Sequence, residues 1–242
     1  MKAIYYRSII LLLLFTWLTK TVFSQVSDYK SIFNSDWEKA EAFISENESW
    51  MKSVCDKNDI SFHFAAAIVF PELIRYSALR DRIEISMLKT LYINLGEEYA
   101  DFSIGQFQMK PSFAEQIHEK ISLLNDRKLR NMFKGKTSFR DLKEYRASVV
   151  EDLEDINSQI NYLIAFIKIF EFNYKEKWNN EAEKLKFCST AYNCGLNKKL
   201  TYIESMSEKK FFRTGLIKSE PYSYSDISLY WFDLNYKKGS DR

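Results

Sequence analysis

Apolar residues recur at helical spacing along this chain, and this feature most restricts the fold that it can adopt. Between Ile156 and Phe170 they stand three and four residues apart, as on one face of an amphipathic helix. Segments 35–55 and 181–194 follow the same period, and Gly195 is placed to end the second one. The 242 residues include only six Gly and three Pro, and no alternating strand pattern precedes residues 222–232. The sequence therefore predicts a single, mainly α-helical domain.

The first 24 residues have the form of a secretory signal peptide. Lys2 and Arg7 precede an apolar stretch at 9–18, which is short for a membrane span, and a cleavage site follows before Gln25. We expect a domain of residues 25–242 that is exported, to the periplasm or out of the cell, with no stable membrane insertion after cleavage. An uncleaved N-terminal anchor helix is the alternative.

The charge balance and the content of metal-ligating residues limit which classes of partner and cofactor we expect. The predicted signal peptide holds three of the 35 basic residues and none of the 33 acidic ones, so 32 basic residues remain against 33 acidic. This balance argues against a nucleic-acid partner or an anionic membrane surface. Two His residues, and Cys188 six positions before Cys194, offer no zinc-site spacing. No metal or cofactor is expected, and the domain is expected to be monomeric.

Glu72 lies in a nearly continuous apolar run, residues 62–74, in which His63 is the only other ionisable residue. An ionised carboxylate is costly in such surroundings, so desolvation should raise its pKa towards neutrality. A carboxyl group of this kind can hold a proton and deliver it to a leaving oxygen. The alternative is a salt-bridged core carboxylate with Arg75 or Arg80 as its partner.

Two further segments carry polar groups suited to binding a sugar. "GQFQMKP" places Gln106 and Gln108 after Gly105, and "AYNCG" places Tyr192 and Asn193 at the end of a predicted helix. Amide and hydroxyl groups can bind sugar hydroxyls, and aromatic residues can stack on sugar rings. Together with Glu72 they suggest acid-catalysed cleavage of a glycosidic bond. Gln108 could instead satisfy loop backbone groups, Tyr192 could be an ordinary core residue, and Asn193 could shape the helix end rather than contact substrate.

In this order the three segments resemble the motifs of the soluble lytic transglycosylase (SLT) family of the lysozyme-like superfamily, over about residues 60–195. That family has a catalytic Glu-Ser at the end of a buried helix, then Gly-Leu-Met-Gln before a Pro, then Ala-Tyr-Asn-Ala-Gly. The matching positions here are Glu72, then Gly105, Gln108, Pro111 and Ala114, then Ala191, Tyr192, Asn193 and Gly195.

The resemblance implies a single lysozyme-like helical domain with an active-site groove and a C-terminal extension at 196–242. It implies a peptidoglycan lytic transglycosylase in which Glu72 protonates the oxygen linking N-acetylmuramic acid (MurNAc) to N-acetylglucosamine (GlcNAc). The same residue then acts as base on the muramyl 6-hydroxyl, giving a 1,6-anhydro product. Gln106, Gln108, Tyr192 and Asn193 are the expected substrate-binding residues, and peptidoglycan glycan strands are the expected partner.

The chain departs from the family pattern in three places. Leu73 follows the Glu where the family has Ser, 33 residues separate Glu72 from Gly105, and a basic segment at 125–146 resembles an insertion. That segment is either a solvated helical hairpin or a contact for an anionic polymer. These departures leave room for a non-catalytic peptidoglycan-binding or envelope-assembly protein on the same fold.

A hydrolytic muramidase of the lysozyme type is the other alternative. In such an enzyme water is the nucleophile, and a second carboxylate is needed to activate it. Asp101 is the candidate for this second acid, although it could simply cap the loop. If the predicted helices meet, Cys55 could also form a disulfide with Cys188 or Cys194 in an exported protein.

Overall fold

The computed structural model describes residues 27–79, 85–136, 139, 141–175, 178–215 and 220–240. The predicted signal peptide and Arg80 lie outside these ranges. The described part is mainly helical, which confirms the prediction of a mainly α fold, and its extended segments form only two isolated antiparallel bridges. None of its helices combines the length and the apolar character needed to span a lipid bilayer.

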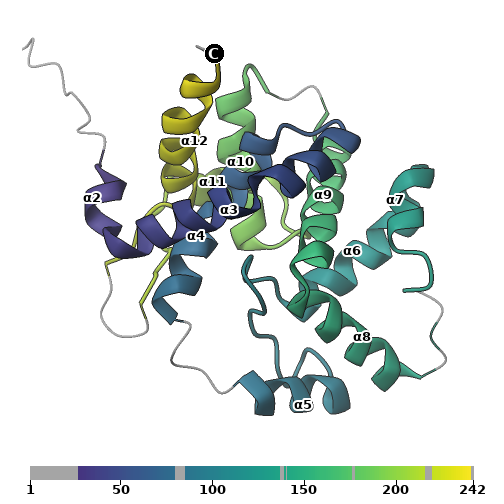
Figure 1. Cartoon of the computed structure of the whole chain (residues 1–242). Coiled ribbons are helices and arrows are strands. Elements are labelled where there is room, and N and C mark those ends of the chain that lie inside the picture. The colour runs from purple at the N-terminus through teal and green to yellow at the C-terminus, as the bar shows by residue number, and fades with distance from the viewer. Residues whose placement is uncertain are drawn as a thin grey trace, which may run out of the picture.

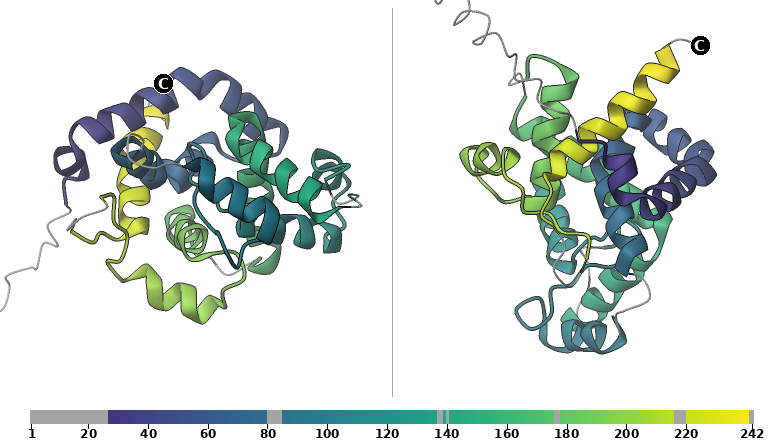
Figure 2. Two further views of the ribbon diagram at one scale, coloured as in Figure 1. Left: turned by 90° about the horizontal axis from the view of Figure 1, so that it is seen from below. Right: turned by 90° about the vertical axis from the view of Figure 1, so that its left-hand side faces the viewer.

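Figure 1 shows how the helices are arranged. In chain order they are α2 (Tyr29–Phe33), α3 (Ser35–Lys57), α4 (Phe62–Leu79), α5 (Ile85–Leu95), α6 (Pro111–Leu123), α7 (Arg127–Met132), α8 (Leu142–Glu154), α9 (Ile156–Asn173), α10 (Glu181–Cys194), α11 (Leu200–Ser207) and α12 (Tyr224–Ser240). Helices α3, α4, α10 and α12 form one end of the molecule, α5 to α8 form the other, and α9 runs between them (Figures 1 and 2).

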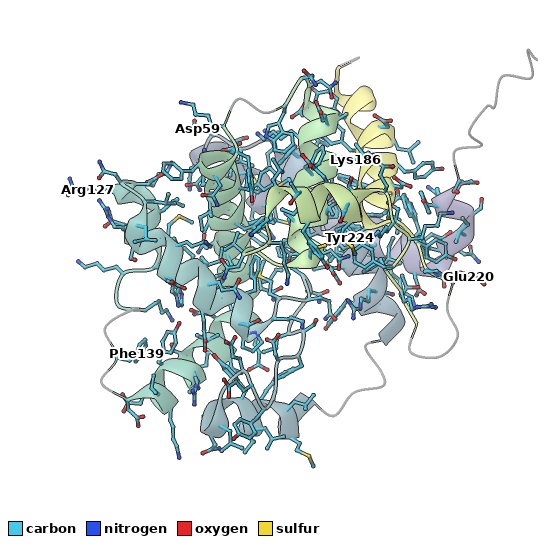
Figure 3. The ribbon with its side chains drawn as sticks, turned by 180° about the vertical axis from the view of Figure 1, so that it is seen from behind. Asp59, Arg127, Phe139, Lys186, Glu220 and Tyr224 are labelled. Atoms are coloured by element: carbon cyan, nitrogen blue, oxygen red, sulfur yellow. The ribbon has the colours of Figure 1, made fainter. Side chains whose placement is uncertain are left out.

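Helix α4 is the central element of the first group and packs against α3, α9, α10 and α12. Its side chains from Phe64 to Phe70 are almost completely buried, as expected for a helix that is apolar on every face. Tyr224, at the start of α12, donates a hydrogen bond to the backbone oxygen of Ile68 over 2.9 Å. Figure 3 shows Tyr224 near the centre of the molecule. The C-terminal extension therefore forms part of the core around α4.

Three helices agree with the sequence prediction. Helices α3, α9 and α10 occupy the predicted segments, and Gly195 ends α10 with a φ of 101°. The alternation in residues 222–232 does not form a strand. Tyr222 makes a single bridge to Phe212, and α12 begins two residues later because Tyr224, Ile227 and Trp231 share one buried helical face.

The second group is organised around buried His118 of α6. The hydroxyl of Tyr145 lies 3.0 Å from its Nδ1, and that of Tyr162 lies 2.8 Å from its Nε2 and donates to Asp152 over 3.1 Å. Burial lowers the pKa of His118 to about 4, so the ring is neutral at pH 7. Because Tyr162 donates to Asp152, the proton of His118 belongs on Nε2. This histidine has a structural role.

The three cysteines are free thiols. Cys55 of α3 and Cys188 of α10 are both buried, and each of these helices packs separately on α4. The expectation of a disulfide from Cys55 to Cys188 or Cys194 is therefore wrong. The described residues of the basic segment 125–146 form α7 and the start of α8, and their side chains are mostly exposed or half-buried, as expected for a solvated helical hairpin.

Candidate functional site

A cavity of about 270 Å³ opens where the second half of α4, the loop 101–110, the start of α6 and the end of α10 meet. Its lining includes Glu72, Asp101, Gln108, Tyr192 and Asn193, so five residues predicted from widely separated segments lie around one space. Gln106 is not among the lining residues. It occupies the turn between Gly105 and Phe107, and the neighbouring Gln108 is the amide that reaches the cavity.

The loop that carries Gln108 is a tight turn closed by a bridge between Ile104 and Met109. The two residues exchange backbone hydrogen bonds of 2.8 and 3.1 Å. Gln108 has a φ of 50°, and its side-chain Nε2 donates to the backbone oxygen of Gly105 over 2.9 Å. The side-chain amide of Gln108 thus satisfies a backbone group of the loop, which is the alternative to sugar binding given above. The residue still lines the cavity.

Gly105 is required by a close approach of this loop to α8 and α9. Its φ is 71°, and a Cβ added there would overlap the side-chain Nε2 of Gln159 and the backbone oxygen of Leu153. Both the left-handed conformation and the lack of space exclude a larger residue. The positive φ and the close packing therefore explain why a glycine opens the "GQFQ" motif.

Phe107 anchors the loop through both of its backbone groups. Its N–H donates to the Oε1 of Gln159 in α9 over 2.8 Å, and its carbonyl oxygen accepts from the hydroxyl of Tyr192 in α10 over 2.7 Å. The Phe107 ring is fully buried and meets Phe43 of α3 edge-on. The wall of the cavity that carries Gln108 is thus fixed to two core helices.

Glu72 is the buried acid of this cavity. Only 5% of its side chain is exposed, and burial raises its pKa to about 7, while the charge of Arg75 acts in the opposite direction. The Nη1 of Arg75 lies 3.6 Å from Oε2 of Glu72, which is an ion pair longer than a hydrogen bond. A carboxyl group with this pKa has both protonation states populated near neutral pH.

Tyr192 and Asn193 approach the cavity from the end of α10. Tyr192 is buried between Phe113 and Phe166, with ring centroids 5.5 and 5.4 Å away, and its hydroxyl is committed to Phe107. Its role in the described structure is to hold the loop. The Nδ2 of Asn193 is buried and has no hydrogen-bond partner among the described residues.

Asp101 lines the cavity but is engaged on both oxygens. Its Oδ1 accepts from the backbone N–H of Ser112 in the first turn of α6 over 3.2 Å, and its Oδ2 pairs with Lys110 at 3.0 Å. This is the loop-capping role that the sequence left open beside the second-acid role.

Three of the six buried side-chain polar atoms that have no partner among the described residues belong to residues of this cavity. Glu72 Oε2, Arg75 Nε and Asn193 Nδ2 are buried, and no described group is within hydrogen-bonding distance and geometry of them. All three residues line the cavity. Each such atom costs about 1–3 kcal/mol, so a cluster of them is a feature of a binding site rather than of a core.

Gln159 is the important residue that the sequence analysis missed. Only 1% of the surface of Gln159 is exposed, and the residue lies within the apolar stripe of α9. Its side-chain amide contacts the loop at both Gly105 and Phe107. A polar residue inside an otherwise apolar helical face was the available signal. Lys198, on the rim of the cavity, was not singled out either, because nothing in its local sequence distinguishes it.

Comparisons of the chain with protein-family models, with curated proteins and with solved structures give no match. The described residues also contain no group of three His, Cys, Asp or Glu side chains placed to hold a metal ion. The fold and the cavity define a mainly helical protein with a buried carboxyl group in a polar cavity. Its function is inferred from that geometry.

Replacing Gly105 by Ala tests the packing of the loop, with Gly135→Ala as the matched control. Both glycines have positive φ, but an added Cβ at Gly135 meets nothing within 4 Å. Both variants should lose about 1 kcal/mol of unfolding free energy from the backbone conformation. Gly105→Ala should lose about 2 kcal/mol more, because the loop must move away from Gln159 and Leu153. Urea denaturation measures both, and equal losses would contradict the close approach.

The raised pKa of Glu72 predicts a pH-dependent difference in stability between the wild type and Glu72→Gln. Its pKa rises from 4.5 to about 7 on folding, so the folded state binds more protons between these values. Wild-type stability should therefore fall as the pH rises, by up to about 1.4 kcal/mol per pH unit, and level off above pH 7. The variant lacks this contribution. Both histidines titrate in both proteins, so their effect cancels in the difference between the two unfolding free energies. Denaturation at pH 5 and pH 8 tests this, and a constant difference contradicts it.

Proposed function

We propose that this protein is an exported peptidoglycan lytic transglycosylase with a lysozyme-like fold and Glu72 as its sole acid and base. The observation that carries the proposal is the buried Glu72 carboxyl, with its pKa raised to about 7, in a cavity lined by amide and hydroxyl groups. Its order of motifs, resembling the SLT family, and the predicted signal peptide also support it. The substrate is the MurNAc–GlcNAc bond of glycan strands.

In the first step, protonated Glu72 gives its proton to the glycosidic oxygen while the bond from this oxygen to the muramyl anomeric carbon breaks. In the free protein the Glu72 carboxylate faces the guanidinium of Arg75 at 3.6 Å, which favours its ionised form. In the second step, the carboxylate takes the proton of the muramyl 6-hydroxyl, and that oxygen bonds to the anomeric carbon. The product is a 1,6-anhydro ring, and Glu72 is protonated again.

The other cavity residues have separate roles in this proposal. Asn193 offers an unpartnered Nδ2 donor to the substrate, and Gln108 offers its side-chain oxygen, since its Nε2 is bonded to Gly105. Tyr192 acts by positioning the loop through Phe107 rather than by contacting Glu72. Gln106 has no assigned contact with the substrate.

Hydrolysis is the second candidate, because Asp101 also lines the cavity and could activate water. Its two oxygens are occupied by Ser112 and Lys110, which leaves it poorly suited as a base. Intramolecular attack by the 6-hydroxyl needs no second carboxylate and therefore fits the site better.

Digestion of purified sacculi separates these functions. Wild-type protein should release 1,6-anhydro-muropeptides, detected by mass spectrometry, and Glu72→Gln should reduce their rate of release by at least about a thousandfold because the proton donor is lost. Glu204→Gln changes an exposed carboxyl outside the cavity and should act like the wild type. Hydrated reducing ends from wild-type protein would support the muramidase instead. Glycan binding without cleavage by any form would support a binding protein.

The pH dependence of cleavage follows from the same group. Because the first step needs protonated Glu72, kcat/KM should fall by about tenfold per pH unit above pH 7, the value near which this carboxyl titrates. Initial rates on solubilised glycan strands between pH 5 and pH 9 measure this. A rate that stays constant across pH 6 to 8.5 would show that Glu72 is not the proton donor.

A further inference from the structure

The cavity carries an excess of positive charge. Its lining contains three cations, Arg75, Lys110 and Lys198, and two carboxylates, Glu72 and Asp101. Lys110 and Asp101 neutralise one another at 3.0 Å. Lys198 has no carboxylate within ion-pair distance in the described part of the chain, and its ammonium lies over the ring of Tyr202 at 5.5 Å. When Glu72 is protonated, neither Arg75 nor Lys198 has a counter-ion among the residues that the structure describes.

Arg75 is placed to serve either Glu72 or a ligand. It lies three residues after Glu72 on α4, and its guanidinium is above the ring of Phe212, 5.8 Å from the centroid. Its side chain is 34% exposed, whereas that of Glu72 is 5% exposed. Its Nε has no hydrogen-bond partner among the described residues, and its contact to Glu72 is longer than a hydrogen bond. Unused donors on a cation at a cavity favour a carboxylate as the missing partner.

We propose that Arg75 exchanges partners on binding: in the free protein it faces the Glu72 carboxylate, and in the complex it holds a carboxylate of the sugar. Glu72, left without its cation, then takes a proton from solvent. Lys198 attracts the same anionic group from the rim. The ligand class is therefore an acidic sugar, and the sugar's own charge loads the acid with its proton. This inference rests on the proposed function for the choice of MurNAc, whose lactyl group supplies the carboxylate.

The groups around Glu72 leave Arg75 as the determining charge. Tyr192 from α10 and Tyr224 from α12 face Glu72, and burial raises the pKa of both phenols, so both remain neutral. Helices α3 and α9 contribute no residue to the lining, and Cys194 is a neutral thiol whose pKa is raised to about 11. The charge of Arg75 favours the ionised carboxyl. Binding of an anion and binding of a proton are thus linked, and each must strengthen the other by the same factor.

The experiment uses the disaccharide GlcNAc–MurNAc, which has the lactyl carboxylate but no MurNAc–GlcNAc bond to cleave. Its methyl ester is the neutral control. Calorimetric titration at pH 6.5 to 8.5, in buffers of different ionisation enthalpy, gives affinity and proton uptake together. The acid should bind more tightly than the ester, take up as much as one proton, and weaken by up to about tenfold per pH unit above pH 7. The affinity of the ester should change less than about twofold.

Variants separate the parts of this proposal. Arg75→Gln should lose both the preference for the acid and the proton uptake, and Arg75→Lys should retain part of each. Glu72→Gln should lose the uptake but keep the preference, and Lys198→Gln should weaken binding of the acid with the uptake unchanged. Lys57→Gln, an exposed change outside the cavity, should behave like the wild type. Circular dichroism confirms that each variant is folded.

Equal affinities of acid and ester, binding of the acid without proton uptake, or no binding of either by the wild type would overturn the proposal. Because the disaccharide is not cleaved, this result is independent of the sacculus digestion. Linked binding without anhydro-muropeptides would reject the transglycosylase and retain the acidic-sugar site. Anhydro-muropeptides without linked binding would do the reverse.

Discussion

The backbone of Phe107 is the point on which the architecture of the site depends. Its N–H and its carbonyl oxygen are bonded to Gln159 of α9 and Tyr192 of α10, both buried. A loop normally runs over the surface because its backbone groups need water. Here two core side chains replace the water and hold a turn against helices that are distant in sequence. The cavity wall facing Glu72 is therefore as firmly placed as the core itself.

Glu72 balances two opposing effects. Burial disfavours its carboxylate, and Arg75 at 3.6 Å favours it, so that the pKa settles at about 7. Burial without the arginine would raise the pKa of Glu72 further, and a shorter ion pair would lower it. The proposed role of Glu72, which is first to donate and then to accept a proton, needs a pKa between these two cases. The long, partly exposed Arg75 contact suits this requirement better than a short salt bridge would.

The sequence predicted the helical class, the segments of α3, α9 and α10, and five of the residues that line the cavity, because these depend on local periodicity and on motifs. It could not assign the partners of those residues. Tyr192 bonds to Phe107, 85 positions away, and Gln159 bonds to the same residue from 52 positions away. Such contacts are fixed by how helices pack, and no local pattern encodes them. For the same reason the sequence could not distinguish Gln106 from Gln108, and only Gln108 lines the cavity.

Leu73 shows how the structure changes the meaning of a departure from a motif. The resembling family has Ser directly after its catalytic Glu, and Leu73 is instead buried, with 2% of its surface exposed. On an α-helix the next residue points about 100° away, whereas residues three and four positions on share a face. Arg75 stands at that third position and supplies the polar neighbour of Glu72. In this chain the polar neighbour of the acid is therefore a charged residue on the same helical face. A charged neighbour can respond to the charge of a ligand, which a serine hydroxyl cannot do.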